Sequence, residues 1–395
     1  MKNLFNINKI TVISLSLIPF TALCVVTLLY IFLSVVGNLS ISLKTTPENI
    51  AQLTTCFGFF YAFGFLIWGV FSDIYGRRRI IIFGLLSLSV VTFLLSLFSN
   101  YGYLLLVRGL QGFFASSFPP VILAWLAENL SDKYRKIAIS LISCAFLLAG
   151  TLGQWFGVTL IHSSINLSMY ILAIIYLISG LIFYFITKNM TDLVPIRQTE
   201  SVNNLSVLKV FVQIPQVFLE RKLIKIYASA LFVLMSFVSL YLILNSNNKS
   251  SMIELNQLRQ IATLGMLNSL FSSWLFSKIT VTKVLASSLL VMSITLALQY
   301  FIFKGYMQQQ IIFFIIHYIY ISSIAFAIPA MITCASMFST QKNRGVAVSL
   351  YTCILFVGAS LGSFLPNCIN IDALFILIII ALFLIGLSVI KLRKG

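Results

Sequence analysis

The chain has 395 residues, of which 60% are hydrophobic and only 9% are charged, and its mean hydropathy is +1.04. A soluble domain carries about 25% charged residues, so this composition excludes a large soluble core and indicates an integral membrane protein. The formal net charge is +17, which a nucleic-acid-binding protein could also have, and the positions of the charges distinguish the two.

Twelve apolar segments follow one another along the chain, and each is long enough to cross a bilayer. They cover residues 11–36, 50–71, 80–99, 102–127, 137–162, 166–187, 223–245, 258–276, 284–303, 310–338, 345–366 and 371–390. The first segment is too long for a signal peptide, and no small-residue cleavage site follows it. It is therefore predicted to be the first of twelve membrane helices, and an even number of crossings places both termini on one side.

The basic residues lie mainly on the side of the two termini. Of the 26 lysines and arginines, 21 fall on that side, four on the opposite side or at its helix ends, and Arg108 inside a span. Basic residues accumulate in cytoplasmic loops, so both termini are predicted to be cytoplasmic in a cell membrane, with a bacterial inner membrane expected. This asymmetry accounts for the net charge, and no nucleic-acid partner is expected.

A short polar turn separates the second and third apolar segments. It reads Gly69-Val-Phe-Ser-Asp-Ile-Tyr-Gly-Arg-Arg-Arg79. The turn resembles the loop between helices 2 and 3 of the major facilitator superfamily, usually written G-x-L-x-D-R-x-G-R-[KR]-x, although Ile74 stands where that family usually has a basic residue. The alternative interpretation is a set of arginines that anchors the chain at the cytoplasmic side and has no further role.

The resemblance implies an all-α membrane protein in which twelve helices form two pseudo-symmetric six-helix bundles. The chain would divide into an N-terminal bundle (1–187), a cytoplasmic linker (188–222) and a C-terminal bundle (223–395). The sequence supports a duplication independently, because residues 135–154 align without a gap with residues 344–363 and share seven of twenty positions.

The resemblance also implies a conformational switch at the cytoplasmic helix ends. In the family, ion pairs in this region latch the two halves while the cavity faces outward. The members here would be Gly69, Asp73, Gly76, Arg77, Glu128 and Arg135, with Asp132 beside them. Asp73 would lie near the start of helix 11, where free N–H groups favour an anion. The alternative is a set of ordinary solvated loop charges.

Arg108 is the only arginine well inside a predicted span. A charge there costs about 2.5–3.5 kcal/mol or more, so we expect it to face a wet cavity or a partner. The run Arg108-Gly-Leu-Gln-Gly112 resembles the family's helix 4 motif R-x-x-Q-G. This implies a role in proton coupling or substrate binding for Arg108, with Gln111 as a polar group that could line a cavity. The alternative is an arginine that extends to the outer interface.

Gly150, Gly153 and Gly157 lie at positions i, i+3 and i+7 of the fifth predicted helix and share one face. Small residues on one face allow close helix packing. The segment resembles in part the family's antiporter motif G-x-x-x-G-P-x-x-G-G, with Gln154 in the place expected for the proline. Packing and an exporter motif both stay open, and Gln154 is a candidate residue for substrate binding or proton coupling.

None of the nine acidic residues lies in the middle of a predicted span. Many proton-coupled carriers keep a carboxylate at mid-membrane, so a proton would have to bind elsewhere in this chain. His317 in the tenth segment is a candidate, because histidine titrates near neutral pH. The alternative is a packing histidine whose ring is hydrogen-bonded. A cavity without acids favours a neutral, weakly apolar or anionic substrate.

These features predict a secondary transporter that exports a small molecule, coupled to protons, by alternating access of a cavity between two bundles. The protein is expected to work as a monomer in the lipid bilayer and not to be an enzyme. No cofactor or metal is expected, since the six cysteines form no C-x-x-C pair. No Walker-type glycine loop is visible, so ATP drive is not expected.

Two other functions stay open. One is an uptake carrier for a nutrient or metabolite, and the other is a membrane sensor or scaffold that does not transport. The only soluble stretch, residues 188–222, is too short to fold alone as a partner domain. A channel is disfavoured, because no repeated charged or carbonyl-rich filter segment is visible.

Overall fold

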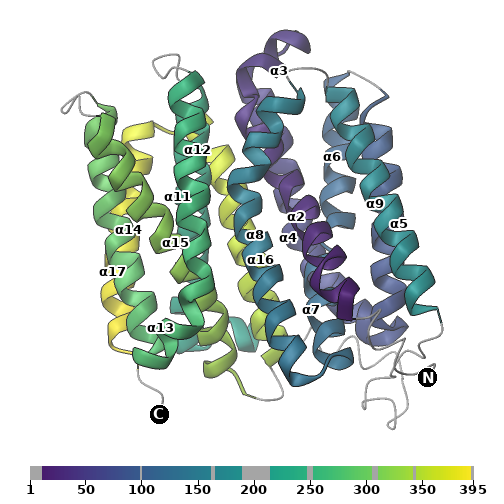
Figure 1. The fold of residues 1–395 in the computed structure, drawn as a ribbon. Helices are drawn as coiled ribbons and strands as arrows, with labels where there is room; N and C mark the ends of the chain where they lie inside the picture. Colours follow the sequence, from purple (N-terminus) through teal and green to yellow (C-terminus); the bar gives the residue numbers. More distant parts are fainter. Residues whose placement is uncertain are drawn as a thin grey trace.

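The computed structural model describes residues 11–97, 100–161, 165–188, 214–246, 252–304, 310–340 and 344–392. These residues form α-helices and short 3₁₀ turns, and no strand occurs among them. Eleven helical segments of this part of the chain are long and apolar enough to cross a membrane. The fold of the described residues is therefore all-α, as predicted, and the first and the last described helix have their outer chain ends at the same side of the bundle, which we call the terminus side (Figure 1).

The helices of the two halves follow the predicted spans closely. The first half contains α2 (Leu17–Tyr30), η1 (Ile31–Ser34), α3 (Val36–Ser42), α4 (Pro47–Tyr75), α5 (Arg77–Leu95), α6 (Tyr101–Ala115), α7 (Phe118–Asn129), α8 (Asp132–Ile161) and α9 (Ile165–Thr187). The second half contains α11 (Arg221–Ser246), α12 (Met252–Leu267), η3 (Asn268–Phe271), α13 (Ser272–Lys278), α14 (Val281–Phe303), α15 (Gln310–Phe338), α16 (Arg344–Phe364), η4 (Leu365–Asn367) and α17 (Ile371–Ile390). Most of the predicted linker, residues 188–222, lies outside the described residues, so the domain boundaries stay predictions.

Broken helices form several of the predicted crossings, among them the eighth and the fourth. The eighth consists of α12, η3 and α13, and the break falls at Asn268, whose side-chain amide donates to the hydroxyls of Tyr318 and Ser322 in α15. The fourth is interrupted between α6 and α7, directly before Pro119 and Pro120. Proline has no N–H to donate to the preceding turn and disfavours helical geometry in the residue before it. The eighth segment is not among the eleven candidate spans of the described residues, and with it the count is twelve.

The predicted duplication is confirmed by how the fifth helix of each half packs on the first. A Cβ added to Gly153 in α8 would lie 3.1 Å from the carbonyl oxygen of Thr27 in α2. A Cβ added to Gly362 in α16 would lie 2.7 Å from the carbonyl oxygen of Met235 in α11. These two glycines are aligned with each other in the sequence repeat, so the same close backbone approach occurs twice in the fold.

The burial pattern is that of a membrane protein. Large apolar side chains such as Phe185 (67% exposed) and Trp274 (63% exposed) cover the outside, whereas charged and polar side chains such as Arg108, Arg259 and His317 are buried. Lipid solvates an apolar exterior, and polar groups at membrane depth are placed against other protein groups. The side chains that could carry function are therefore inside the bundle.

Candidate functional site

A cavity of about 510 Å³ lies between the two halves. Its lining begins near the helix ends on the side of the termini, at Gly69, Arg77 and the exposed Gly345. It reaches Tyr61 at the middle of α4 and Phe237 deep in α11. The cavity therefore runs from the terminus side, which we call its mouth, to the middle of the bundle.

Beyond the cavity, on the side away from the termini, polar contacts join the two halves. The hydroxyls of Thr55 in α4 and Ser363 in α16 lie 2.7 Å apart and are buried. The hydroxyl of Thr263 in α12 donates to that of Thr151 in α8 at 3.1 Å. We call these four residues the far-side seam. Each pair links one half to the other, so the seam must separate before the cavity can open on that side.

A buried arginine lies beside the far-side seam. Arg259 in α12 is 2% exposed and donates to the side-chain oxygens of Asn245 in α11 and Asn256. The amide of Asn245 also donates to Gln154 in α8, at 3.4 Å. The Nε of Arg259 has no hydrogen-bond partner among the residues that the structure describes. The arginine thus connects both halves through neutral amides.

Arg259 corrects one sequence-based expectation. Arg259 is one of the four basic residues, with Lys44, Lys249 and Lys304, that the sequence places on the opposite side or at its helix ends. Arg108 was then the only arginine well inside a predicted span. In the structure α12 begins at Met252, about two turns before Arg259, and the arginine is buried. The polar residues at the start of this helix hid its true beginning, because a hydropathy pattern locates the apolar part of a span and not its first turn.

Five aromatic rings surround the end of the cavity that lies at the middle of the bundle, away from the mouth. Tyr61 and Phe65 of α4 both pack on Phe356 of α16, with ring centroids 4.6 and 5.3 Å apart. Tyr30 of α2 packs edge to face on Phe237 of α11, with centroids 5.9 Å apart. All five line the cavity, and we call them the aromatic floor. Each of these contacts joins a ring of the first half to a ring of the second half. The boundary between the two bundles therefore runs through the aromatic floor.

Charge is nearly absent from the cavity. Arg77 is the only charged residue in its described lining, and it lies at the mouth. The candidate residues Arg108, Gln111, Gln154 and His317 are all buried in the helices around the cavity and not in its lining. A direct role of their side chains in holding a substrate stays a prediction.

Arg108 in α6 is held by neutral partners. Its guanidinium donates to the side-chain oxygen of Gln111 at 2.6 Å and to the carbonyl oxygens of Leu28 at 3.0 Å and Leu53 at 3.4 Å. It also lies 4.3 Å from the ring centroid of Phe57. Arg108 is fully buried, so its side chain does not extend to the outer interface. Carbonyl dipoles and the negative face of a ring stabilise this cation without a carboxylate.

Arg108 is separated from the cavity by one ring. Phe57 stacks on Tyr61 of the aromatic floor, with centroids 5.4 Å apart and ring planes 23° apart. Gln111 holds the other side of the arginine in place and donates to the hydroxyl of Thr92 at 2.8 Å. Gly112 allows this close arrangement, because a Cβ there would collide with the backbone carbonyl of Phe57. The R-x-x-Q-G run is therefore also a packing motif between α6 and α4.

His317 in α15 has a defined tautomer. Gln299 donates its amide N–H to the carbonyl oxygen of Thr295, so its side-chain oxygen faces Nδ1 of His317 at 2.8 Å. Nδ1 must then carry the proton, and Nε2 accepts from the hydroxyl of Tyr241 at 2.9 Å. Both ring nitrogens of His317 therefore have hydrogen-bond partners. Tyr241 in turn packs on Phe237 of the aromatic floor, with centroids 4.8 Å apart.

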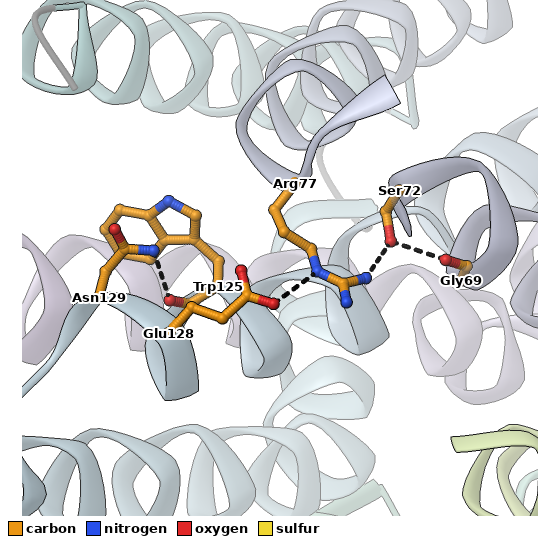
Figure 2. Close-up of polar contacts among 6 residues, drawn as sticks. All are labelled: Gly69, Ser72, Arg77, Trp125, Glu128 and Asn129. Carbon is orange, nitrogen blue, oxygen red and sulfur yellow. Dashed lines mark hydrogen bonds and ion pairs between the residues drawn. The ribbon is translucent and has the colours of Figure 1, made fainter. Parts of the chain in front are cut away.

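The predicted switch residues gather where α4 ends and α5 begins, at the mouth of the cavity. Arg77 donates to Glu128 in α7 at 3.2 Å and to the hydroxyl of Ser72, which donates to the carbonyl oxygen of Gly69 at 2.8 Å (Figure 2). Gly76 turns the chain between the two helices with φ of 94°, a conformation that favours glycine. This part of the predicted cluster is assembled in the structure.

Other members of the predicted switch lie outside the description. Asp73 is part of α4, and Asp132 and Arg135 are part of α8, but their side chains are not among those described. Gly69, one turn before Asp73, is near the second half, because a Cβ there would be 3.8 Å from the hydroxyl of Ser349 in α16. The end of α4 that contains Asp73 therefore lies near the first turns of α16, which is the eleventh predicted membrane helix.

The three glycines of α8 lie against other helices. Gly157 packs on the backbone carbonyl of Ile31 in η1 so closely that any Cβ would collide with it, and Gly153 lies near Thr27. Gly150 is nearest to the ring of Phe237 and also lines the cavity. These contacts agree with the packing interpretation of the glycine face.

Sequence and structure comparisons point to one family. The profile of the Major Facilitator Superfamily matches residues 18–363. A Bicyclomycin resistance protein homolog from Haemophilus influenzae is 28% identical over 174 residues, which is 42% of this chain and 42% of that protein. A Citrinin biosynthesis cluster MFS transporter, mrr1 of Monascus ruber, is 30% identical over 106 residues, 27% of this chain and 21% of that protein. The chain thus spans less than half the length of either relative.

Solved transporter structures have the same fold. A peptide transporter POT in complex with sulfate superimposes with a TM-score of 0.76, covering 97% of this chain and 96% of that one, at 13% identity. A mutant of the nucleoside transporter NupG gives a TM-score of 0.67, covering 94% of this chain and 99% of that one, at 12% identity. At such low identity these matches show the fold alone.

Proposed function

Because this chain belongs to the major facilitator superfamily, we propose that it is a secondary transporter that exports a small molecule by alternating access and couples the export to protons. The observation that carries the proposal is the cavity between the halves, which reaches the mouth on the terminus side and is blocked on the other side by the far-side seam. A cavity of this form belongs to one of the two states of an alternating-access cycle.

Export is favoured over uptake by two considerations. The positive-inside asymmetry supports a cytoplasmic mouth, from which the cavity can load solute from the cell interior. The Haemophilus relative is described as a resistance protein homolog, a name that fits removal of a toxic compound. We propose that the protein works as a monomer in a bacterial inner membrane with both termini in the cytoplasm.

For proton coupling we propose Arg108 and His317, because the chain has no carboxylate within the middle of its predicted spans. Both residues lie one aromatic ring away from the aromatic floor, through Phe57 and Tyr241 respectively. If bound solute moves the ring of Phe57, the contacts of Arg108 change. If it moves Tyr241, the hydrogen bonds of His317 change. The cycle would then move a proton and solute in opposite directions.

The switch at the mouth is proposed to govern the exchange between the two states. Arg77 is held by Glu128 and Ser72 in the present arrangement, in which the cavity reaches the mouth. When the cavity opens to the far side, the mouth must close, and α4 and α16 come together there. Asp73 would then meet the start of α16, where exposed N–H groups bind an anion.

The test is transport by purified protein in proteoliposomes, measured across a panel of neutral, anionic and cationic solutes with and without an imposed pH gradient. The proposal predicts movement of at least one solute against its gradient when protons flow the other way. Arg108→Gln should abolish stimulation by the pH gradient while solute exchange at equal pH continues. Transport that ignores the pH gradient in every case would refute proton coupling, and solute movement in the same direction as protons would favour an uptake carrier.

A further inference from the structure

The aromatic floor combines three properties that select a class of ligand. Its rings come from both halves, the described cavity lining beside it carries no charge, and it contains one buried hydroxyl without a hydrogen-bond partner among the described residues. The inference below rests on the proposed function in one respect, namely that the cavity is the route of the transported solute.

The first property is the geometry of the rings. Phe356 lies between Tyr61, which meets it edge to face at 90°, and Phe65, which stacks on it at 8°. Aromatic pairs prefer these edge-to-face and stacked arrangements, and a bound aryl group can join them in the same manner. A ligand seated here touches α4 and α16 together, so it contacts both halves of the transporter.

The second property is the absence of charge. No acidic residue is part of the described lining, and the cationic Arg77 stands at the mouth, away from the floor. A ligand that carries a full charge would lose its hydration without gaining an ion pair at the floor. Ring faces attract cations, but this attraction is weak beside the loss of water around the ion. A neutral ligand avoids that loss.

The third property is the hydroxyl of Tyr61. The residue is fully buried and lines the cavity. Its hydroxyl has no hydrogen-bond partner among the residues that the structure describes. A buried hydrogen-bond donor without a partner destabilises the folded protein. A ligand that accepts a hydrogen bond from this donor therefore gains more binding free energy than it would from a donor that water already serves. By contrast, the hydroxyl of Tyr351, also in the cavity lining, already donates to the carbonyl oxygen of Ile328.

We propose that the aromatic floor binds neutral, aryl-bearing solutes that carry one strong hydrogen-bond acceptor, and that this acceptor pairs with the hydroxyl of Tyr61. The rings of Tyr61, Phe65 and Phe356 hold the aryl groups, and the hydroxyl fixes their orientation. The cavity volume of about 510 Å³ accommodates several aryl rings.

Three probes of similar shape test the proposal. Triphenylphosphine oxide is neutral and carries a strong acceptor, triphenylmethane is neutral without one, and methyltriphenylphosphonium is a cation without one. Equilibrium binding of each radiolabelled probe is measured on the purified full-length protein. The proposal predicts that the oxide binds most tightly. Tyr61→Phe should weaken binding of the oxide by about fivefold, the effect of one hydrogen bond, and leave binding of triphenylmethane unchanged.

Two further variants separate the hydroxyl from the rings. Phe356→Leu should weaken binding of both neutral probes, because both use the ring. Tyr227 is a buried tyrosine outside the described cavity lining, and its hydroxyl donates weakly to the carbonyl oxygen of Ala347. Tyr227→Phe removes this hydroxyl and should leave the binding of both neutral probes unchanged. The proposal is overturned if the phosphonium binds as tightly as the oxide, if Tyr61→Phe leaves binding of the oxide unchanged because a water molecule serves the hydroxyl, or if no probe binds.

These results are distinguishable from failure of the proposed function. Tight binding of the oxide without transport of any solute in proteoliposomes would refute transport and leave the ligand class intact. Proton-coupled transport of other solutes without binding of the oxide would refute the ligand class alone.

Discussion

Thr55 of α4 and Ser363 of α16 share a buried hydrogen bond of 2.7 Å across the boundary between the two halves. The helices are close there, because a Cβ on Gly58, one turn further along α4, would collide with the hydroxyl of Ser360 in α16. In an alternating-access cycle this contact forms in one state and breaks in the other. The pair is therefore a site at which the cycle can be stopped.

We expect that a disulfide between Thr55→Cys and Ser363→Cys, in a chain whose native cysteines have been replaced, blocks transport. The bond would hold the far-side seam closed, and cysteine pairs this near in space can meet the geometry of a disulfide. Transport is measured in proteoliposomes after oxidation and again after reduction. The single variants are the controls and should transport equally under both conditions. A cross-linked protein that transports at full rate would show that the halves do not separate here.

Arg259 is expected to hold the far side closed. Arg259→Gln removes the charged donor that connects α12 to Asn245, and a hydrogen bond from a charged group is worth about 2 kcal/mol. Both residues belong to the second half, so the loss acts on closure only through Asn245, whose amide donates to Gln154 of the first half at 3.4 Å, and we expect a shift toward the open far side of about fivefold. The measurement is the rate at which a membrane-impermeant maleimide, added from the far side, labels Thr151→Cys in the cysteine-free chain. Labelling should be faster in Arg259→Gln, and unchanged labelling would contradict a role in closure.

Much of the fold could be predicted from the sequence, because the lipid bilayer restricts which segments can cross it. A segment that crosses the membrane as a helix must be mainly apolar, so hydropathy located the spans, and the orientation given by the basic residues stays a prediction. The repeat that aligns Gly153 with Gly362 indicated the duplication, and the structure has the same close backbone approach at both glycines. The breaks at Asn268 and before Pro119 were not predicted, because they leave the hydropathy of the spans unchanged.

The site was less predictable for a physical reason. A cavity between two bundles is a property of how far apart the helices stand, and its apolar lining looks like any other apolar helix face in sequence. Tyr61 and Phe356 are separated by nearly 300 residues and are indistinguishable from lipid-facing aromatics until the halves are placed together. Arg108 and His317 were recognised because polar groups within spans are rare, yet the structure places both behind the cavity.

The glycine face of α8 gives a test of packing. Gly157→Ala should lower stability, because its new Cβ would collide with the backbone of Ile31 and force η1 and α8 apart. Overpacking of this kind costs about 1–3 kcal/mol. The measurement is the thermal unfolding midpoint of the purified protein. The matched control is Gly37→Ala in α3, where no atom lies within 4 Å of an added Cβ, and this variant should unfold at the original temperature or above it. Equal midpoints for the two variants would contradict the packing role.

Asp73 and Glu128 are both proposed switch residues, and we expect the loss of Asp73 to slow transport more than the loss of Glu128. Glu128 forms a partly exposed ion pair with Arg77, with side chains 32% and 18% exposed, and such a pair contributes about 0–1 kcal/mol. Asp73 would instead meet the free N–H groups at the start of α16 when the mouth closes, a charge-assisted contact that forms in only one state.

We therefore expect Asp73→Asn to slow transport by about tenfold or more, corresponding to about 1.4 kcal/mol or more of lost stabilisation along the cycle. Equilibrium binding of the transported solute should stay within about twofold, because Asp73 lies one turn beyond Gly69 at the mouth end of α4, far along the helix from Tyr61 in the aromatic floor. Initial transport rates and binding affinities are measured on the same preparation, with Glu128→Gln as the matched carboxylate-to-amide control. A loss of binding in Asp73→Asn would place the residue in solute recognition, and equal slowing in Glu128→Gln would assign the effect to charge at the mouth in general.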